Sequence, residues 1–183
     1  MSGLIYTGIG SRLITDEVQS TMTFIARCLA KHSYTLRSGA ADGADAAFEA
    51  GALKKEIYLP WRGFNKHSSN YYVLNEKAYQ VASENHPVWV KLTPAAKKLH
   101  GRNAYQVLGY DLDAPSDFLI CWTQDGCESH IERTYRTGGT GTAISIASKN
   151  NIPIFNLANS GCYQRLQTFL KHQDVFLPDF NTV

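Results

Sequence analysis

The sequence predicts an α/β protein with a Rossmann-like, three-layer αβα fold and a mostly parallel sheet. Short apolar runs alternate with helical patterns along the chain, which is typical of parallel strands joined by crossover helices. Glycine-rich turns follow or adjoin apolar runs at residues 7–12, 38–45 and 138–143. In such folds we expect turns of this kind to share one crevice at the carboxyl ends of the strands. The length of 183 residues, 44% of them hydrophobic, suits a single domain over residues 1–183.

The middle glycine-rich turn is the stretch around which the chain is organised. Residues 35–49 predict a short strand, a turn and the first turns of a helix. Gly39 and Gly43 allow positive φ and let a ligand approach the backbone. The amides that start a helix, at the positive end of its dipole, form an anion site. We therefore predict a nucleotide phosphate here, although an ordinary turn with Asp42 or Asp45 as the helix cap uses the same residues.

The first part of the chain predicts strands and helices in alternation. The run 5–8 is expected to be a central parallel strand because it is short and apolar. Thr15, followed by acidic residues, caps a helix over 16–32. A strand follows at 34–37, and the helix after the middle turn is expected to end near Gly51 as its C′ residue.

The same alternation continues to the end of the chain. Pro87 ends one predicted helix and Pro94 starts the next. We predict a strand over 56–60, a helix over 71–84, a strand over 117–122, a loop or short hairpin over 127–136, a helix over 144–150, an edge strand over 152–157, a helix over 163–172 and a tail.

A loop at residues 61–67 is aromatic, basic and polar, and it follows a predicted strand. Trp61 and Phe64 are suited to stacking on a base, and Arg62 or Lys66 to meeting a phosphate. The competing interpretation is that the aromatic side chains fold back onto the core. Both interpretations stay open on the sequence alone.

The helix that starts at Pro94 carries the clearest basic cluster of the sequence. Lys97, Lys98 and Arg102 compose it, and a solvated helix face explains it without any partner. His100 and Arg102, beside Asn103, are better placed to meet a phosphate or an acidic partner.

Charge and cysteine content limit the function classes. A net charge of +2 does not by itself indicate nucleic acid. Cys28 and Cys121 fall in apolar runs, and no CxxC pair is present, so we expect core thiols, no structural zinc and no cofactor. No stretch resembles a signal peptide or a membrane span, so a reducing, cytoplasmic compartment is expected.

The three turns together resemble the SLOG superfamily of Rossmann-like domains. The motifs are TGIGSR at residues 7–12, SGAADGAD at 38–45 and GGTGTA at 138–143. This superfamily includes DprA-like, LOG-like and YpsA-like proteins, and the middle motif is similar to the DprA and YpsA signature. The whole chain looks most like small DprA-like proteins of phages and bacteria, which implies a host cytoplasm if the gene is carried by a phage. The resemblance covers roughly residues 4–157 and identifies the superfamily better than any one activity.

One departure from the LOG pattern concerns the enzymatic interpretation. LOG enzymes carry a glutamate just after their Gly-Gly-x-Gly-Thr motif, whereas Thr142 is followed here by Ala143 and Ile144. The carboxylate expected to assist N-glycosidic cleavage is absent from that place. Asp45, Glu49, Asp125 and Glu132 are the possible substitutes, and no sequence feature decides among them. We name Asp45 and Glu49 as candidate catalytic residues because they lie one helical turn apart.

Three functions follow in order of preference: a nucleotide or nucleotide-derived ligand is bound; single-stranded DNA is bound in the manner of DprA-like proteins; or a nucleotide N-glycosidic bond is cleaved. The resemblance also implies a homo-oligomer, since domains of this superfamily often pair. The predicted ligand-binding residues are Gly8, Gly10, Ser11, Arg12, Arg37, Ser38, Gly39, Asp42, Gly43, Trp61, Arg102, Gly138, Gly139, Thr140, Gly141 and Thr142.

Overall fold

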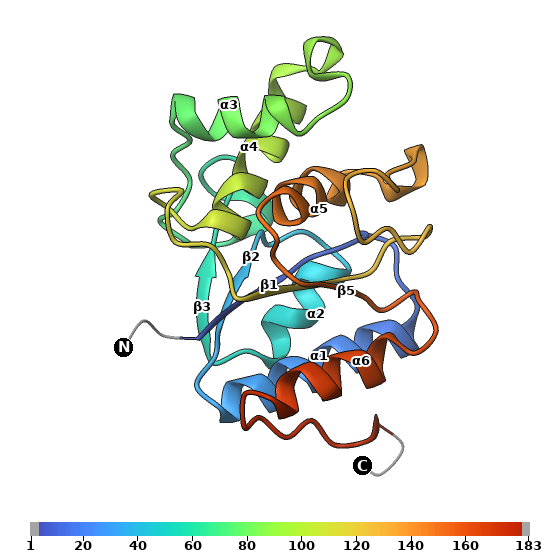
Figure 1. Ribbon diagram of the computed structural model, residues 1–183. Helices are drawn as coiled ribbons and strands as arrows, with labels where there is room; N and C mark the ends of the chain where they lie inside the picture. The colour runs from blue at the N-terminus through green and yellow to red at the C-terminus, as the bar shows by residue number, and fades with distance from the viewer. Residues whose placement is uncertain (1–3, 181–183) are drawn as a thin grey trace.

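A computed structural model describes residues 4–180 and confirms the α/β class. Five parallel strands form one sheet in the order β3-β2-β1-β4-β5, with β1 at its centre as predicted (Figure 1). The strands are β1 (Ile5–Gly8), β2 (Thr35–Ser38), β3 (Lys54–Ile57), β4 (Phe118–Cys121) and β5 (Ile154–Asn156). β5 lies at one edge, where Pro153 just before it costs no interior ladder bond.

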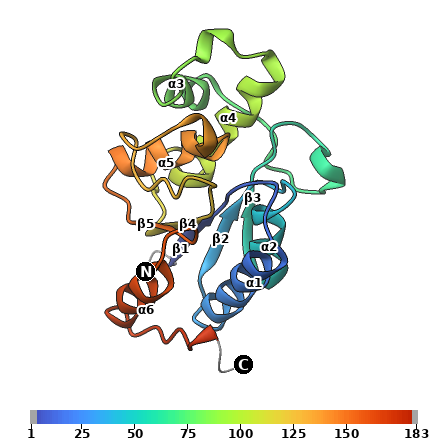
Figure 2. The ribbon, with the colours of Figure 1, turned by 90° about the vertical axis from the view of Figure 1, so that its right-hand side faces the viewer.

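Helices cover both faces of the sheet and complete the three layers. One face carries α1 (Asp16–Lys31), α2 (Ala44–Gly51) and α6 (Cys162–Lys171). The other carries α3 (Glu76–Glu84), α4 (Pro94–Leu108) and α5 (Thr140–Lys149). The two groups stand on opposite sides of the sheet in both ribbon views (Figures 1 and 2).

Each helical layer has its own apolar core against the sheet. Met22, Ile25 and Leu29 of α1 recur at helical spacing and pack with Phe48 of α2 and Leu166 of α6. On the other face, α4 and α5 bury Val107, Ile144 and Ile146 against β4 and β5. The centre of the sheet is therefore buried on both faces, which is why β4 is a fully buried apolar run without alternation.

Local signals explain where the helices begin. The Thr15 hydroxyl accepts from the Val18 amide and starts α1 as predicted. α3 begins at Glu76 rather than near residue 71, because Asn75 caps it by accepting from the Ala78 amide. α5 begins at Thr140, four residues before the predicted start, so part of the third glycine-rich turn is itself helical.

Strand β3 begins two residues earlier than predicted, at Lys54 instead of 56. As an edge strand, β3 tolerates exposed lysines. The prediction rested on the apolar run 57–60, which begins at the last residue of the strand and continues past it. Of the tail predicted after residue 172, residues 181–183 lie outside the described part of the chain.

The prediction that Gly51 is the C′ residue of α2 is wrong. Gly51 is the last helical residue, and Ala52 follows in an extended conformation. A Cβ at Gly51 would collide with the Thr23 carbonyl of α1. The residue is therefore glycine because two helices pack closely there, and not because the chain needs a positive φ.

All four cysteines are buried free thiols. Within residues 4–180, no group of His, Cys, Asp or Glu side chains is arranged to hold a metal ion. No helix in that range combines the length and apolar character needed to cross a membrane.

Candidate functional site

A crevice of about 600 Å³ opens where β1, β2 and β4 end. All three glycine-rich turns reach it, as predicted for the carboxyl ends of parallel strands. The predicted site residues that line it are Gly10, Ser11, Arg12, Asp45, Arg102, Gly138, Gly139 and Thr140. Its volume suits a ligand of nucleotide size.

Two of the glycines bring backbone segments together. Gly43 has φ 76°, and a Cβ there would lie 2.5 Å from the carbonyl oxygens of Ser11 and Arg12. The neighbouring Ala44 amide donates to the Ser11 carbonyl at 3.1 Å. A Cβ at Gly10 would lie 2.8 Å from the Trp122 carbonyl. The first turn is thus clamped between the middle turn and the end of β4, which fixes one wall of the crevice.

Arg102 of α4 forms the floor of the crevice. Its side chain is buried, its Nη1 donates to the Gly39 carbonyl, and its guanidinium lies 5.4 Å over the Phe64 ring. Its Nε has no hydrogen-bond partner within the described chain. The Arg102 side chain therefore connects α4 to the middle turn, and its Nε–H remains an unpaired donor within residues 4–180.

Gln106 lies one helical turn after Arg102 and was missed by the sequence analysis. The residue is 1% exposed, lines the crevice, and neither its amide nitrogen nor its amide oxygen has a partner among residues 4–180. A buried unpaired amide costs free energy, so its retention is informative. The signal was present, because Asn103 and Gln106 follow His100 and Arg102 at helical spacings.

Asp45 is the carboxylate that lines the crevice from α2. Its Oδ2 accepts from the Ala41 amide at 3.3 Å. Burial raises the pKa of Asp45 to about 6, against the lowering effects of Arg102 and of the amides of Ala41, Gly39 and Gly10. The side chain therefore changes protonation state close to neutral pH.

His100 brings a second titratable side chain into the crevice. Its Nδ1 is 2.9 Å from the Thr142 hydroxyl oxygen. Burial, together with the positive groups of His86, Arg133 and Arg102, lowers the pKa of His100 to about 4. The imidazole is consequently neutral at physiological pH, and the crevice holds its charge mainly on arginine.

Asp45 and His100 are expected to give opposing pH dependences of stability. The folded pKa of Asp45 lies above its ordinary value of 3.8, so its contribution is present below pH 3.8 and lost as pH rises through about 6. The folded pKa of His100 lies below 6.5, so its contribution is present above pH 6.5 and lost as pH falls through about 4. Over this window the two slopes oppose each other.

Single substitutions separate the two contributions. Asp45→Asn removes the contribution that falls with pH, so its melting temperature should rise between pH 4 and 6.5 relative to wild type. His100→Gln removes the contribution that rises with pH, so its melting temperature should fall over the same range relative to wild type. The limiting slope is about 1.4 kcal/mol per pH unit for one proton. Melting temperatures of the three proteins across this range test the assignment. Parallel curves would contradict it.

The third turn is positioned by Asp125, which follows β4. Its Oδ2 accepts from the hydroxyls of Thr134 and Thr137, both at 2.5 Å, and its Oδ1 accepts from Thr123 at 2.9 Å. Burial alone would raise its pKa, but these hydroxyls and the Cys127 amide hold the pKa of Asp125 below its ordinary value. The segment 127–136, predicted as a loop or short hairpin, is thus held to Asp125 through Thr134.

The N-terminus of α5 faces the crevice without a side-chain cap. Gly139 is the N-cap residue, and a Cβ at Gly138 or Gly139 would meet open space. The first amides of a helix have no intrahelical partner, and they carry the positive end of the dipole. Asn103 supports this terminus by donating from Nδ2 to the Gly139 carbonyl at 3.1 Å.

Several predicted site residues do not line the crevice: Gly8, Arg37, Ser38, Gly39, Asp42, Gly43, Glu49, Trp61, Gly141 and Thr142. Gly39 lies directly behind the floor formed by Arg102 and Gln106. The Thr142 hydroxyl contacts His100, which does line the crevice. The Ser38 hydroxyl donates to the Gly8 carbonyl at 2.7 Å and so joins β2 to β1.

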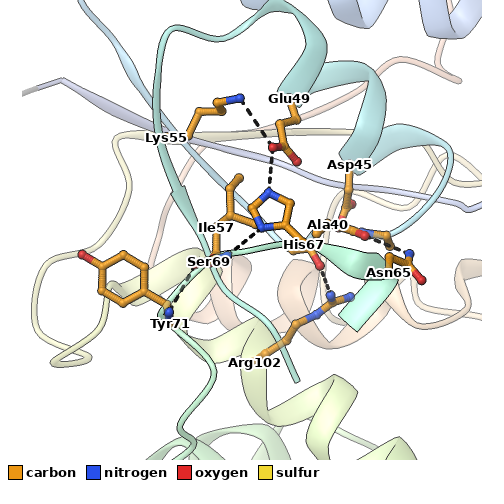
Figure 3. A network of polar contacts seen from close by, with 12 residues as sticks. Ala40, Asp45, Glu49, Lys55, Ile57, Asn65, His67, Ser69, Tyr71 and Arg102 are labelled. Atoms are coloured by element: carbon orange, nitrogen blue, oxygen red, sulfur yellow. Dashed lines mark hydrogen bonds and ion pairs between the residues drawn. The ribbon is translucent and has the colours of Figure 1, made fainter. Parts of the chain in front are cut away.

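Of the two candidate catalytic carboxylates, Asp45 lines the crevice and Glu49 does not. Glu49 points toward β3, where its Oε1 lies 2.9 Å from His67 Nε2 and 3.4 Å from Lys55 Nζ (Figure 3). These contacts tie the start of the long loop after β3 to α2. The two carboxylates lie one helical turn apart on α2, but Asp45 meets the Ala41 amide of the middle turn and Glu49 meets Lys55 and His67.

Arg37 is also placed away from the crevice. Its Nε lies 2.7 Å from Glu56 Oε2, and its Nη1 donates to the Ala114 carbonyl. The arginine joins two neighbouring strands on the face that α4 covers. Arg37 precedes a glycine-rich turn in the sequence, but its guanidinium is held by Glu56 and the Ala114 carbonyl and does not line the crevice.

The aromatic loop folds back on the protein at Phe64, which is buried beneath Arg102. Trp61 packs edge-to-face on Phe64 with ring centroids 5.2 Å apart. The predicted basic cluster is divided, because Arg102 points inward while Lys97 lies 5.7 Å from the Trp89 ring centroid. Lys97, Lys98 and Arg102 therefore do not form one surface patch.

Comparisons with known proteins give the following result. No family model matches the chain, and no curated protein matches it significantly. Among solved structures, the chain is similar to DNA processing protein A from Helicobacter pylori, described for its unique single-stranded DNA binding mode. The identity is 17%, the match covers 93% of this chain and 81% of that one, and the TM-score is 0.40. The function is therefore inferred from the crevice itself.

Proposed function

We propose that this protein binds a nucleotide or nucleotide-derived ligand in the crevice, with a phosphate at the N-terminus of α5. The observation that carries the proposal is the buried amide of Gln106, which lines the crevice and lacks any partner in the described chain. Beside it, Arg102 keeps an unused Nε. Together they offer two donors and one acceptor to a ligand.

The phosphate position follows from the electrostatics of the crevice. The uncapped start of α5 and the guanidinium groups of Arg12 and Arg102 are positive, while Asp45 is the one acidic side chain among the described lining residues. Free backbone amides at a helix N-terminus bind phosphate oxygens well. A phosphate there leaves the remainder of the ligand over the floor.

The base or ribose position follows from Gln106. Its amide presents a donor and an acceptor side by side, which matches the edge of a base or a pair of ribose hydroxyls. The crevice also contains the side chains of Trp122 and Leu99, which supply apolar surface. A few polar groups beside apolar surface are typical of small-molecule sites.

A thermal-shift panel tests the proposal. It contains nucleoside mono-, di- and triphosphates, ADP-ribose, cyclic nucleotides and inorganic phosphate. A ligand at 100 times its dissociation constant adds about 2.7 kcal/mol, a shift of roughly 5–11 °C for a chain of this size. Arg12→Gln should reduce the shift without altering the unliganded melting temperature, since Arg12 is exposed.

Arg27→Gln is the matched control, because Arg27 is an exposed arginine on α1 that does not line the crevice. It should leave both melting temperatures unchanged. The nucleosides without phosphate are measured beside the panel. Shifts that are absent for every nucleotide, or that are equally large for these nucleosides, would contradict the proposal.

Single-stranded DNA is the second candidate ligand. The favouring observation is that the exposed residues Arg12 and Arg136 line the crevice from two different turns, giving an open and basic mouth. DNA affinity should then fall with salt, with a slope near −0.7 per neutralised phosphate. Arg12→Gln with Arg136→Gln should flatten the slope, whereas Lys97→Gln with Lys98→Gln should not.

A further inference from the structure

A second cavity of about 700 Å³ adjoins the crevice. The two share His100, Gly138 and Gly139, so the exposed backbone before α5 lies between them. The second cavity is walled by the segment after α3, by the loop that precedes the third turn, and by α5. None of the predicted functions used it.

Arg133 is the dominant charge of this cavity. Its side chain is partly buried, and its Nη1 donates to the Asn85 carbonyl at 2.7 Å. It packs against Gly141, where a Cβ would leave it no room. No acidic side chain of the described residues forms an ion pair with it. The cation is therefore placed at the positive end of α5 without compensation.

The other charged groups facing the cavity add little negative charge. His86, His130 and Lys149 are basic, and the Lys149 ammonium donates to the Glu84 carbonyl at 3.1 Å. The carboxylate of Glu84 accepts from Gln80 along α3 at 3.0 Å. Burial and then the charge of Arg133 lower the pKa of His86, as expected where positive groups crowd together.

An anion would compensate the charge of Arg133, which is unpaired within the described chain. A phosphate between Arg133 and the exposed amides near Gly139 gains charge-assisted hydrogen bonds from both. The buried Asn85 Oδ1 also lacks a partner within residues 4–180, and it would accept from a ligand hydroxyl or amino group. The cavity thus offers cations for a phosphate and an acceptor for the unit attached to it.

We propose that the second cavity binds a second phosphate-bearing unit of the ligand, so that the ligand crosses the Gly138-Gly139 backbone with one nucleotide-type unit on each side. This inference rests on the proposed function of the first crevice. The chemical class is two ribosyl or deoxyribosyl phosphates joined by a pyrophosphate or phosphodiester link. The open space at Gly138 and Gly139 lets that link lie on the backbone.

Titration calorimetry with three probes tests this proposal. The probes are adenosine monophosphate, ADP-ribose and a 5′-phosphorylated adenine deoxydinucleotide. We expect at least one two-unit probe to bind about tenfold or more tightly than the monophosphate. Arg133→Gln and Lys149→Gln should each weaken that probe by about fivefold or more and change the monophosphate affinity by less than about twofold. Arg27→Gln serves again as the control.

The two variants protect the test against misfolding. Arg133→Gln removes the contact with the Asn85 carbonyl and could disturb the fold. Lys149 is exposed, so Lys149→Gln is expected to leave the fold intact. Equal weakening of one-unit and two-unit probes, or no advantage for either two-unit probe, would overturn the proposal. Preference for ADP-ribose would identify a pyrophosphate-linked small molecule, and preference for the dinucleotide a nucleic-acid strand.

A titration with inorganic pyrophosphate separates this proposal from the proposed function. Nuclear magnetic resonance follows the Arg133 Nε–H and the amides of Gly138 and Gly139. Pyrophosphate shifts at Arg133 without monophosphate binding would overturn the function proposed for the first crevice, and with it the two-unit ligand, and would leave only an anion site in the second cavity. Monophosphate binding with unresponsive Arg133 signals would overturn the two-unit ligand and leave the proposed function intact. No response to any probe would overturn both.

Discussion

Replacing Gly39 with alanine is expected to weaken nucleotide binding by more than about 100-fold and to lower the free energy of unfolding by about 1–3 kcal/mol. A Cβ at this position would lie 2.6 Å from Arg102 Cζ and Nη1 and 2.6 Å from Gln106 Nε2. Both floor side chains must then move. The Arg102 guanidinium would also lose its bond to the Gly39 carbonyl.

Urea unfolding and calorimetry with the ligand found by the thermal-shift panel measure the two effects. Gly139→Ala is the matched control for stability, because Gly139 has helical φ and ψ and a Cβ there meets open space. Its unfolding free energy should change by less than about 0.5 kcal/mol. Retained affinity in Gly39→Ala would show that the floor does not hold the ligand.

Replacing Gln106 with methionine is expected to stabilise the free protein and to abolish binding. Both amide atoms of Gln106 are buried without a partner, and removing an unpaired buried polar group gains about 1–3 kcal/mol. Methionine has a similar shape and a similar helix propensity. The ligand loses its donor and acceptor at the same time.

The measurement pairs the unfolding free energy with the ligand affinity. Gln164→Met on α6 is the control, since Gln164 is exposed and should change stability by less than about 0.5 kcal/mol. A destabilised Gln106→Met protein with normal affinity would mean that the amide serves the fold. A gain in stability with lost binding would mean that the amide is kept for the ligand.

The sequence predicted the fold class well because both faces of the sheet are covered by helices. Short strands of three or four residues that alternate with helices have few other arrangements. The errors occur where tertiary packing overrides local signals. Lys54 belongs to an edge strand although it is polar, and Gly51 is set by the Thr23 carbonyl of a neighbouring helix. No pattern within one segment carries that information.

The convergence of the three turns was predictable, but the roles of individual residues were not. Gly10 and Gly43 serve contacts between backbones that are distant in sequence. Glu49 lies one turn after Asp45 yet pairs with His67. Gln106 follows Arg102 at helical spacing, but that signal becomes informative only with the burial of its amide, which is unpaired among the described residues. The direction of a side chain at the end of a strand or helix depends on residues that are close in space but distant in the sequence.

The buried guanidinium of Arg102 has an evolutionary consequence. It fills the space that a side chain at position 39 would occupy, and it faces the carboxylate of Asp45. Positions 39, 45 and 102 should therefore covary among homologues. A lineage that gains a side chain at position 39 should already have shortened residue 102, and one that loses the arginine should no longer keep the aspartate. Glycine at a βα turn would then be inherited together with a residue more than sixty positions away.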